Sequence, residues 1–97
     1  MAIKVRLVGV LEGLAGKPEI HMKPKKSRLT VSEAISELCR SIHSRELERA
    51  IIDPISRTVA SNVIVLVNDK DISVLKGLDT KVESNDTVTL IPVSHGG

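Results

Sequence analysis

Apolar and polar residues alternate near the start of the chain in the pattern of a half-buried strand. One face carries apolar side chains at a period of two, namely Ile3, Val5, Leu7 and Leu11. The other face begins charged and becomes apolar, with Lys4, Arg6, Val8 and Val10 in order. A strand over residues 3–11 is therefore predicted. The shorter alternation in "PEIHMKP", residues 18–24, predicts a second strand that pairs with the first as a hairpin across "GLAG".

A helical stripe follows the hairpin. In "TVSE", Glu33 stands three residues after Thr30, which is the pattern of a capping box at a helix N-terminus. Apolar residues then recur at helical spacing and predict the main helix, through Val31, Ala34, Ile35, Leu38, Cys39 and Ile42. After a break in this phase, a second short helix is predicted from about Arg45 to Ile52, because Asp53-Pro54 stops it.

The second half of the chain is rich in short strands. "VIVLV", residues 63–67, is apolar on both faces, which is typical of a central strand covered on both sides. "ND" at residues 68–69 turns the chain into a short return strand in "KDISVL", and a loop or single helical turn follows. In the last strand, within residues 86–93, Val88 and Leu90 face one way, and the other face carries Thr87, Thr89 and Ile91. This order predicts a two-layer α+β domain over residues 1–92, with one main helix packed across one face of a mixed sheet.

Composition narrows the classes of function. The 97 residues are 41% hydrophobic and 27% charged, and they include no Phe, Trp or Tyr, so the core is built from Val, Ile and Leu. A net charge of +2 and the lack of aromatic stacking surfaces argue against direct nucleic-acid binding. Cys39 is the single cysteine and lies in the helical stripe, where we expect it to be buried. With no disulfide possible and no signal peptide or membrane span indicated, we expect a cytoplasmic protein.

No arrangement typical of catalysis or of metal binding occurs in the sequence. The three histidines are more than twenty residues apart, and one cysteine cannot supply the sulfur ligands of a zinc site. Neither a phosphate-binding glycine loop nor a nucleophile elbow is present. We therefore expect no metal, no bound cofactor and no turnover by the isolated chain. The basic loop "KPKKSR", residues 23–28, is interpreted as a solvated face, with docking to an acidic partner as the alternative.

The unusual chemistry lies at the end of the sequence. Residues 93–97 are predicted to form a flexible tail, which closes with Ser94, His95, Gly96 and Gly97. Fully extended, five residues reach about 16–18 Å, enough to enter a deep cleft of another protein. Glycine has no Cβ, so Gly-Gly can pass through a narrow channel and present a carboxylate that an enzyme could join to the α-phosphate of ATP. The alternative is that Gly-Gly is a loose end or an expression scar.

A set of motifs resembles the β-grasp sulfur carriers. The segment "VLVNDKDISVLKGLDTKVESNDTVTLIPVSHGG" combines an apolar strand, "VNDKDI", "GLDT", an "ND" step, a second apolar strand, a proline and Gly-Gly. Near the start, "LVGVLEGLAGK" is similar to a loop that closes with "LAG" in the small subunit of molybdopterin synthase. The same family includes the thiamine-pathway sulfur carrier and the ubiquitin-related modifier, to which "VND" and "SHGG" are most similar.

This resemblance implies a β-grasp, ubiquitin-like fold, which agrees with the order of elements predicted above. It implies that an activating enzyme of the ubiquitin-activating type uses ATP to adenylate Gly97. Gly97 would then become a thiocarboxylate and give its sulfur to an acceptor such as the molybdopterin synthase large subunit or a tRNA thiolase. The alternative is a protein modifier joined through Gly97 to lysines of target proteins. In both cases the chain is a substrate or non-catalytic subunit of partner enzymes.

A candidate docking surface is predicted on the sheet face that points away from the main helix. It comprises Val8 and Val10, Ile91 and one face of residues 63–67. An aliphatic sheet face that would otherwise meet water marks a protein-binding surface. The alternative is that the second helix or the loop 53–62 covers it. The family that the chain resembles often has Phe in the first and last strands, where this sequence has aliphatic residues around Val8 and Ile91. His95 is expected to steer the tail in a partner cleft, or else to be solvated.

Overall fold

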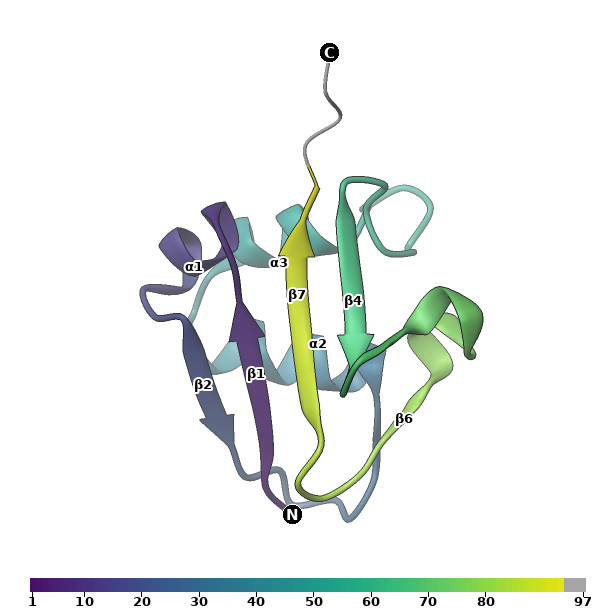
Figure 1. Cartoon of the computed structure of the whole chain (residues 1–97). Helices are drawn as coiled ribbons and strands as arrows, with labels where there is room; N and C mark the ends of the chain where they lie inside the picture. Colours follow the sequence, from purple (N-terminus) through teal and green to yellow (C-terminus); the bar gives the residue numbers. More distant parts are fainter. Residues whose placement is uncertain (94–97) are drawn as a thin grey trace.

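A five-stranded sheet forms one layer of the structure, and the two longer helices lie together behind it (Figure 1). The computed structural model describes residues 1–93, and the sheet order is β2-β1-β7-β4-β5. The strands are β1 (Ile3–Leu7), β2 (Glu19–Met22), β4 (Val63–Val67), β5 (Lys70–Asp71) and β7 (Thr87–Pro92). The central strand β7 runs parallel to β1 and antiparallel to β4, while β1 and β2 form the predicted antiparallel hairpin. The predicted α+β class with a mixed sheet is confirmed.

The helical layer consists of α2 (Val31–Ser41) and α3 (Arg45–Ile51), which match the two predicted helices closely. A second, two-stranded sheet of β3 (Leu29–Thr30) and β6 (Lys81–Val82) was not predicted. The predicted return strand is short, because the chain leaves β5 after two residues. It then forms two 3₁₀ turns, η1 (Ile72–Val74) and η2 (Gly77–Asp79).

The core lies between the sheet and these helices and is entirely non-aromatic. Alternate residues of the strands point into it, which explains why Val5, Val65, Val88 and Leu90 are almost fully buried. The helices supply the opposite wall, with Val31, Leu38, Leu47 and Ile51 among the most buried side chains. Cys39 belongs to this wall, as predicted, and burial raises the pKa of its thiol to about 11. Such a thiol is protonated at neutral pH and is therefore a poor nucleophile.

The predicted first strand is too long, and this is the main correction to the element order. β1 ends at Leu7, and residues Val10–Ala15 form a short helix, α1. The chain turns at Gly9, whose φ of +60° is a conformation that side chains disfavour. Leu11 is buried from α1 rather than from a strand. A spacing of four from Leu7 to Leu11 fits a strand and a helix equally well, which is why alternation alone misassigned it.

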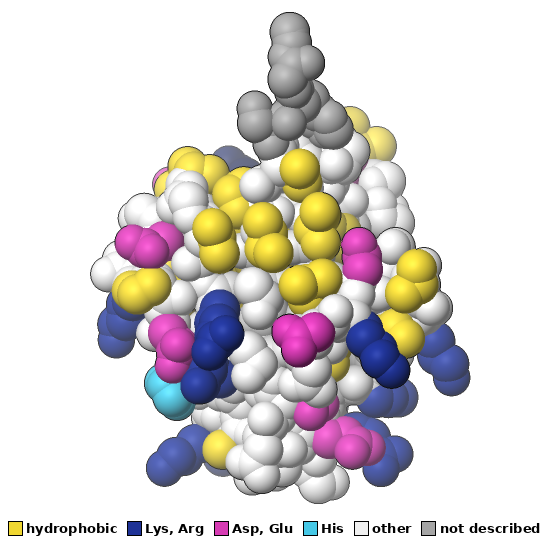
Figure 2. Space-filling model, in the orientation of Figure 1, with side chains coloured by type: hydrophobic (Ala, Val, Ile, Leu, Met, Phe, Trp, Pro, Cys, Tyr) yellow, Lys and Arg dark blue, Asp and Glu magenta, His cyan; other side chains and the backbone are white. Residues whose placement is uncertain are grey.

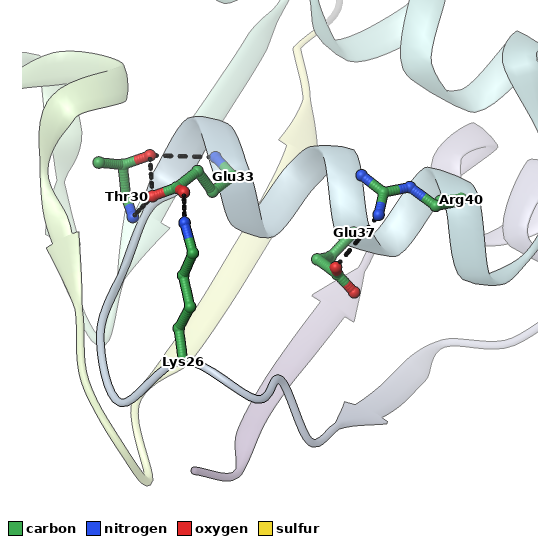
Figure 3. A network of polar contacts seen from close by, with 5 residues as sticks. All are labelled: Lys26, Thr30, Glu33, Glu37 and Arg40. Atoms are coloured by element: carbon green, nitrogen blue, oxygen red, sulfur yellow. Dashed lines mark hydrogen bonds and ion pairs between the residues drawn. The ribbon is translucent and has the colours of Figure 1, made fainter.

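The N-terminus of α2 carries the predicted capping box (Figure 3). The Glu33 backbone N–H donates to Thr30 Oγ1 over 3.1 Å, and the Thr30 backbone N–H donates to Glu33 Oε1 over 3.0 Å. Lys26, from the basic loop, adds an ion pair to the same carboxylate. The loop is therefore tied to the helix at this point.

Glu33 is expected to stabilise the fold at neutral pH and to lose this effect in acid. The hydrogen bond from Lys26 and that from the Thr30 backbone lower the pKa of Glu33 from 4.5 to about 2. A lowered carboxyl pKa contributes stability that is present above the unfolded-state value and is lost as the pH falls to the folded-state value. Glu33→Gln keeps a capping side chain without the charge, so it should melt at a lower temperature than the unaltered protein at pH 7.

This deficit should shrink as the pH falls from 4.5 towards 2, as measured by thermal unfolding followed by circular dichroism. Glu37→Gln, on the same helix but outside the capping box, is the matched control, and its deficit at pH 7 should be smaller. A deficit for Glu33→Gln that stays constant over this pH range would contradict the expectation.

Candidate functional site

The sheet face opposite α2 and α3 is open, and its upper half is apolar (Figure 2). Ile91 on β7 pairs with Ile64 on β4. On the other side, the Val8 N–H donates to Leu90 O over 3.2 Å, so Val8 follows β1 alongside Ile91. Side chains two residues apart on a strand point to the same face, so Leu66 and Val93 belong to the same group. We call this group the open-face patch: Val8, Ile64, Leu66, Ile91 and Val93.

The other half of the open face is charged. Glu19 on β2 lies 3.5 Å from Lys4 Nζ and 3.7 Å from Arg6 Nε. The ring nitrogen Nε2 of His21 is 3.0 Å from the same carboxylate. Partial desolvation raises the pKa of Glu19, but the charge of Lys4 and the hydrogen bond from His21 outweigh it and hold the pKa below its usual value. These exposed ion pairs contribute little to stability. The open face therefore has a charged half, around Glu19, and an apolar half, which lies at the end of β7.

The docking residues predicted from sequence are only partly brought together. Val8 and Ile91 are neighbours, and 45% of Val8 is exposed. Val10, by contrast, is not on a strand, because it opens α1, where 65% of its surface is exposed. Its predicted place on the face of the first strand was wrong, since the chain turns at Gly9.

The open-face patch is not covered by the second helix. Leu47 and Ile51 of α3 are buried in the core, and Figure 1 shows α3 behind the sheet with α2. The prediction that β4 is covered on both faces was therefore wrong. Ile64 and Leu66 are partly exposed, while Val63, Val65 and Val67 are buried. Ile64 and Leu66 are thus the face of residues 63–67 that the sequence placed in the docking surface without naming its residues.

The chain leaves β7 through a tightly packed exit. The Val93 N–H donates to Asn62 O over 2.7 Å, which extends the pairing of β7 with β4 by one residue. On the other side, a Cβ added to Gly9 would lie 3.2 Å from Pro92 Cγ. Gly9 thus allows the β1–α1 turn to pack against the end of the strand. The predicted tail residues Ser94, His95, Gly96 and Gly97 lie outside the described residues.

Neither a metal site nor a membrane-spanning helix is found in the part of the chain that the structure describes. Within residues 1–93, no three side chains among His, Cys, Asp and Glu gather closely enough to hold a metal ion. Among the helices in the same range, none combines the length and apolar character that a membrane span requires.

A mixed sheet with its helices on one face, and an apolar patch on the other beside the end of the last strand, define the class of ubiquitin-like β-grasp proteins. The Urm1 (ubiquitin related modifier) family model matches residues 2–97. A ubiquitin-related modifier 1 homolog of Drosophila willistoni is 32% identical over 93 residues, which cover 91% of this chain and 93% of that protein. A protein of Archaeoglobus fulgidus, described as a candidate sulfur carrier, is 31% identical over the full length of both chains.

A solved structure agrees with these sequence relationships. The solution structure of Urm1 from Trypanosoma brucei superimposes with a TM-score of 0.80 at 26% identity, covering 99% of this chain and 95% of that one. The chain therefore belongs to the Urm1 family of ubiquitin-related modifiers. This membership confirms the predicted β-grasp fold and the assignment to ubiquitin-like sulfur carriers and modifiers.

Proposed function

We propose that this protein is a sulfur carrier whose C-terminal Gly97 is adenylated by a partner enzyme and then converted to a thiocarboxylate. The observation that carries the proposal is the position of the open-face patch, which continues along β7 to Val93, immediately before the tail. A partner that covers the patch therefore holds the point from which the tail departs. From Val93, the four remaining residues reach about 13–14 Å when extended, far enough to enter an active site.

The chemistry at Gly97 follows from its free carboxylate. A carboxylate oxygen attacks the α-phosphorus of ATP, and pyrophosphate leaves with the electron pair of the broken P–O bond. The terminal sulfur of an enzyme persulfide then attacks the acyl carbon, and AMP leaves. A thiol reduces the resulting acyl disulfide and releases the thiocarboxylate. Glycine at both terminal positions keeps this carbon free of side-chain obstruction.

The partners required by this scheme are an activating enzyme and a sulfur acceptor. The activating enzyme supplies the ATP site, so the carrier itself needs no cofactor. The acceptor is an enzyme of cofactor synthesis or of tRNA thiolation, and the open-face patch is the surface for docking both partners. Aliphatic side chains without a mobile charged group lose little conformational entropy when such an interface forms. The carrier acts as a substrate or non-catalytic subunit throughout.

A second candidate function is a protein modifier joined to lysines through Gly97. The observation that favours it is membership of the Urm1 family, which is named for ubiquitin-related modifiers. The relative from Drosophila willistoni carries the same name. The two functions share the adenylated intermediate and diverge at its nucleophile. A persulfide sulfur yields the carrier, whereas a lysine amine that attacks the acyl carbon yields an isopeptide bond.

The intact mass of the protein, isolated from cells that contain its activating enzyme, tests the proposal. We expect a mass increase equal to the replacement of one oxygen by sulfur, confined to the C-terminal peptide. The same protein from cells without the activating enzyme is the control and should show no increase. An unchanged mass together with larger species, in which Gly97 is joined to lysines, would favour the modifier instead. An unchanged mass without conjugates would contradict both functions.

A further inference from the structure

The outer edge of β4 is only partly used in the sheet. On this side, β5 pairs with Leu66 and Val67 alone. The Val63 N–H donates to Ala60 O over 3.0 Å, but within residues 1–93 no strand pairs with Val63–Val65 on this side. An unpaired strand edge offers a template for an added strand unless something covers it. Here the space beside the edge is hollow rather than filled.

A hollow of about 720 Å³, which we call the edge hollow, lies against this part of β4. Its floor is apolar and includes Val63, Val65 and Ile72. Charged side chains also line it, namely Arg57, Asp71 and Asp79. One rim is the loop 53–62 and the other is formed by η1 and η2, so the opening has the form of a slot along the strand edge. A slot with an apolar floor beside an unpaired strand edge suits an extended peptide that places alternate side chains inward.

The loop that forms the first rim is held by hydrogen bonds of Asp53, and it presents an apolar residue to water. The Asp53 carboxylate accepts hydrogen bonds from the N–H groups of Ile55 and Ser56, and the Asp53 N–H donates to Thr58 O over 2.9 Å. At the tip of this turn, 92% of Ile55 is exposed. On the opposite rim, 78% of Val74 is exposed, next to Ser73 of the hollow. Ile55 and Val74 are thus exposed apolar residues in the two segments that border the hollow, although neither side chain lines it.

A second hollow, of about 290 Å³, adjoins the first and is basic. The two share Ser32, Arg57 and Leu78 in their walls, so they form one continuous groove. The second hollow also contains Arg45, Arg49 and Glu48 of α3, which gives three arginines and a single carboxylate. Within residues 1–93, none of these three arginines forms an ion pair. Their guanidinium groups are free to bind carboxylates in pairs of hydrogen bonds.

We propose that this groove binds an extended peptide segment of a partner protein, in which β-branched apolar residues stand next to acidic residues. The apolar part adds along the free edge of β4 and fills the edge hollow, while the carboxylates meet Arg45, Arg49 and Arg57. A nucleic-acid backbone would use the arginines but would leave the apolar floor of the edge hollow without a partner, so the peptide accounts for more of the groove. Residues of β4, η1, α2 and α3 line the groove. Figure 1 shows β4 near the edge of the sheet and α2 and α3 behind it, on the side away from the open-face patch. The peptide and an enzyme docked on the patch can therefore be bound together.

Selection of peptides from a random displayed library against the immobilised full chain tests this proposal. We expect the enriched peptides to share consecutive β-branched residues flanked by Asp or Glu. On binding, they should shift the amide NMR signals of Val63–Val65 and of the loop 53–62. Arg57→Glu should weaken the best peptide at least about tenfold, because it places a negative charge against the acidic flank.

Lys25→Glu is the matched control, since it makes the same change in charge at an exposed residue outside both hollows. Its affinity for the peptide should stay within twofold of the unaltered protein, as an order-of-magnitude expectation for a distant surface charge. Three results would overturn the proposal: no enriched peptide, enriched peptides without this pattern, or NMR shifts at Val8 and Ile91 of the open-face patch in place of those along the edge of β4. A labelled RNA duplex is tested in parallel. RNA binding that Arg57→Glu abolishes, without peptide enrichment, would assign the groove to phosphates instead. None of these outcomes depends on activation at Gly97.

Discussion

Removal of Gly97 is expected to abolish adenylation of this protein while leaving its fold unchanged. The shortened chain would end at Gly96, so its carboxylate would fall short of the α-phosphate of ATP by about 3.3–3.6 Å, the length of one extended residue. A misplacement of about 1 Å at a reacting atom can already cost about a hundredfold in rate. Exchange of labelled pyrophosphate into ATP by the activating enzyme measures the loss, and we expect no exchange above background.

Gly97→Ala separates the effect of length from that of shape. It keeps the carboxylate in register but adds a methyl group beside the acyl carbon, so we expect reduced but measurable exchange. Both variants should melt at the temperature of the unaltered protein, because the buried residues of the described core all lie at or before Leu90. Full exchange by the shortened chain would show that the reactive carboxylate is not that of Gly97.

Ile91→Glu is expected to weaken docking of the activating enzyme by about thirtyfold or more. Ile91 lies in the middle of the open-face patch, between Val8 on β1 and Ile64 on β4. A carboxylate there must lose its water when a partner covers the patch, and central interface positions of this kind contribute about 2 kcal/mol or more. The expected effect is a raised KM for the carrier in pyrophosphate exchange. The fold should persist, since Ile91 is only partly buried.

Thr87→Glu is the matched control on the same strand and the same face. It lies in the charged half, where its register partner on β1 is Lys4, so an added carboxylate meets a cation rather than an apolar surface. We expect its KM to stay close to that of the unaltered carrier. Equal KM values for the two variants would mean that the activating enzyme docks elsewhere. A raised KM for Thr87→Glu alone would move the docking surface to the charged half.

Local features of the fold could be predicted from the sequence because each depends on residues close together in the chain. The capping box joins Thr30 and Glu33 within one helical turn, and the stripe of α2 repeats over three turns. The alternation of Val88 and Leu90 with Thr89 and Ile91 fixed the two faces of β7. Each of these patterns fits one kind of element only: the capping box and the stripe fit a helix, and the alternation fits a strand.

Features that depend on distant pairing could not be predicted in the same way. β3 and β6 are two residues each and are about fifty residues apart in sequence, too short to give any periodicity. The division of the open face into two halves comes from the register of β1 and β4 against β7, which the sequence does not encode locally. The helix α1 was missed for a different reason, because Leu11 fits two periodicities and only the backbone at Gly9 decides between them.

The parallel pairing of β1 with β7 has a mechanical consequence. Figure 1 shows the start of β1 and the end of β7 at opposite ends of the molecule. Tension between these two points acts along the strands and loads all the pairs from Lys4–Thr87 to Leu7–Leu90 at once. A hairpin such as β1–β2, pulled apart at its open end, would instead lose its pairs one after another. Because resistance to force depends on the unfolding barrier rather than on net stability, even a small domain of this design can withstand a pull on its last strand.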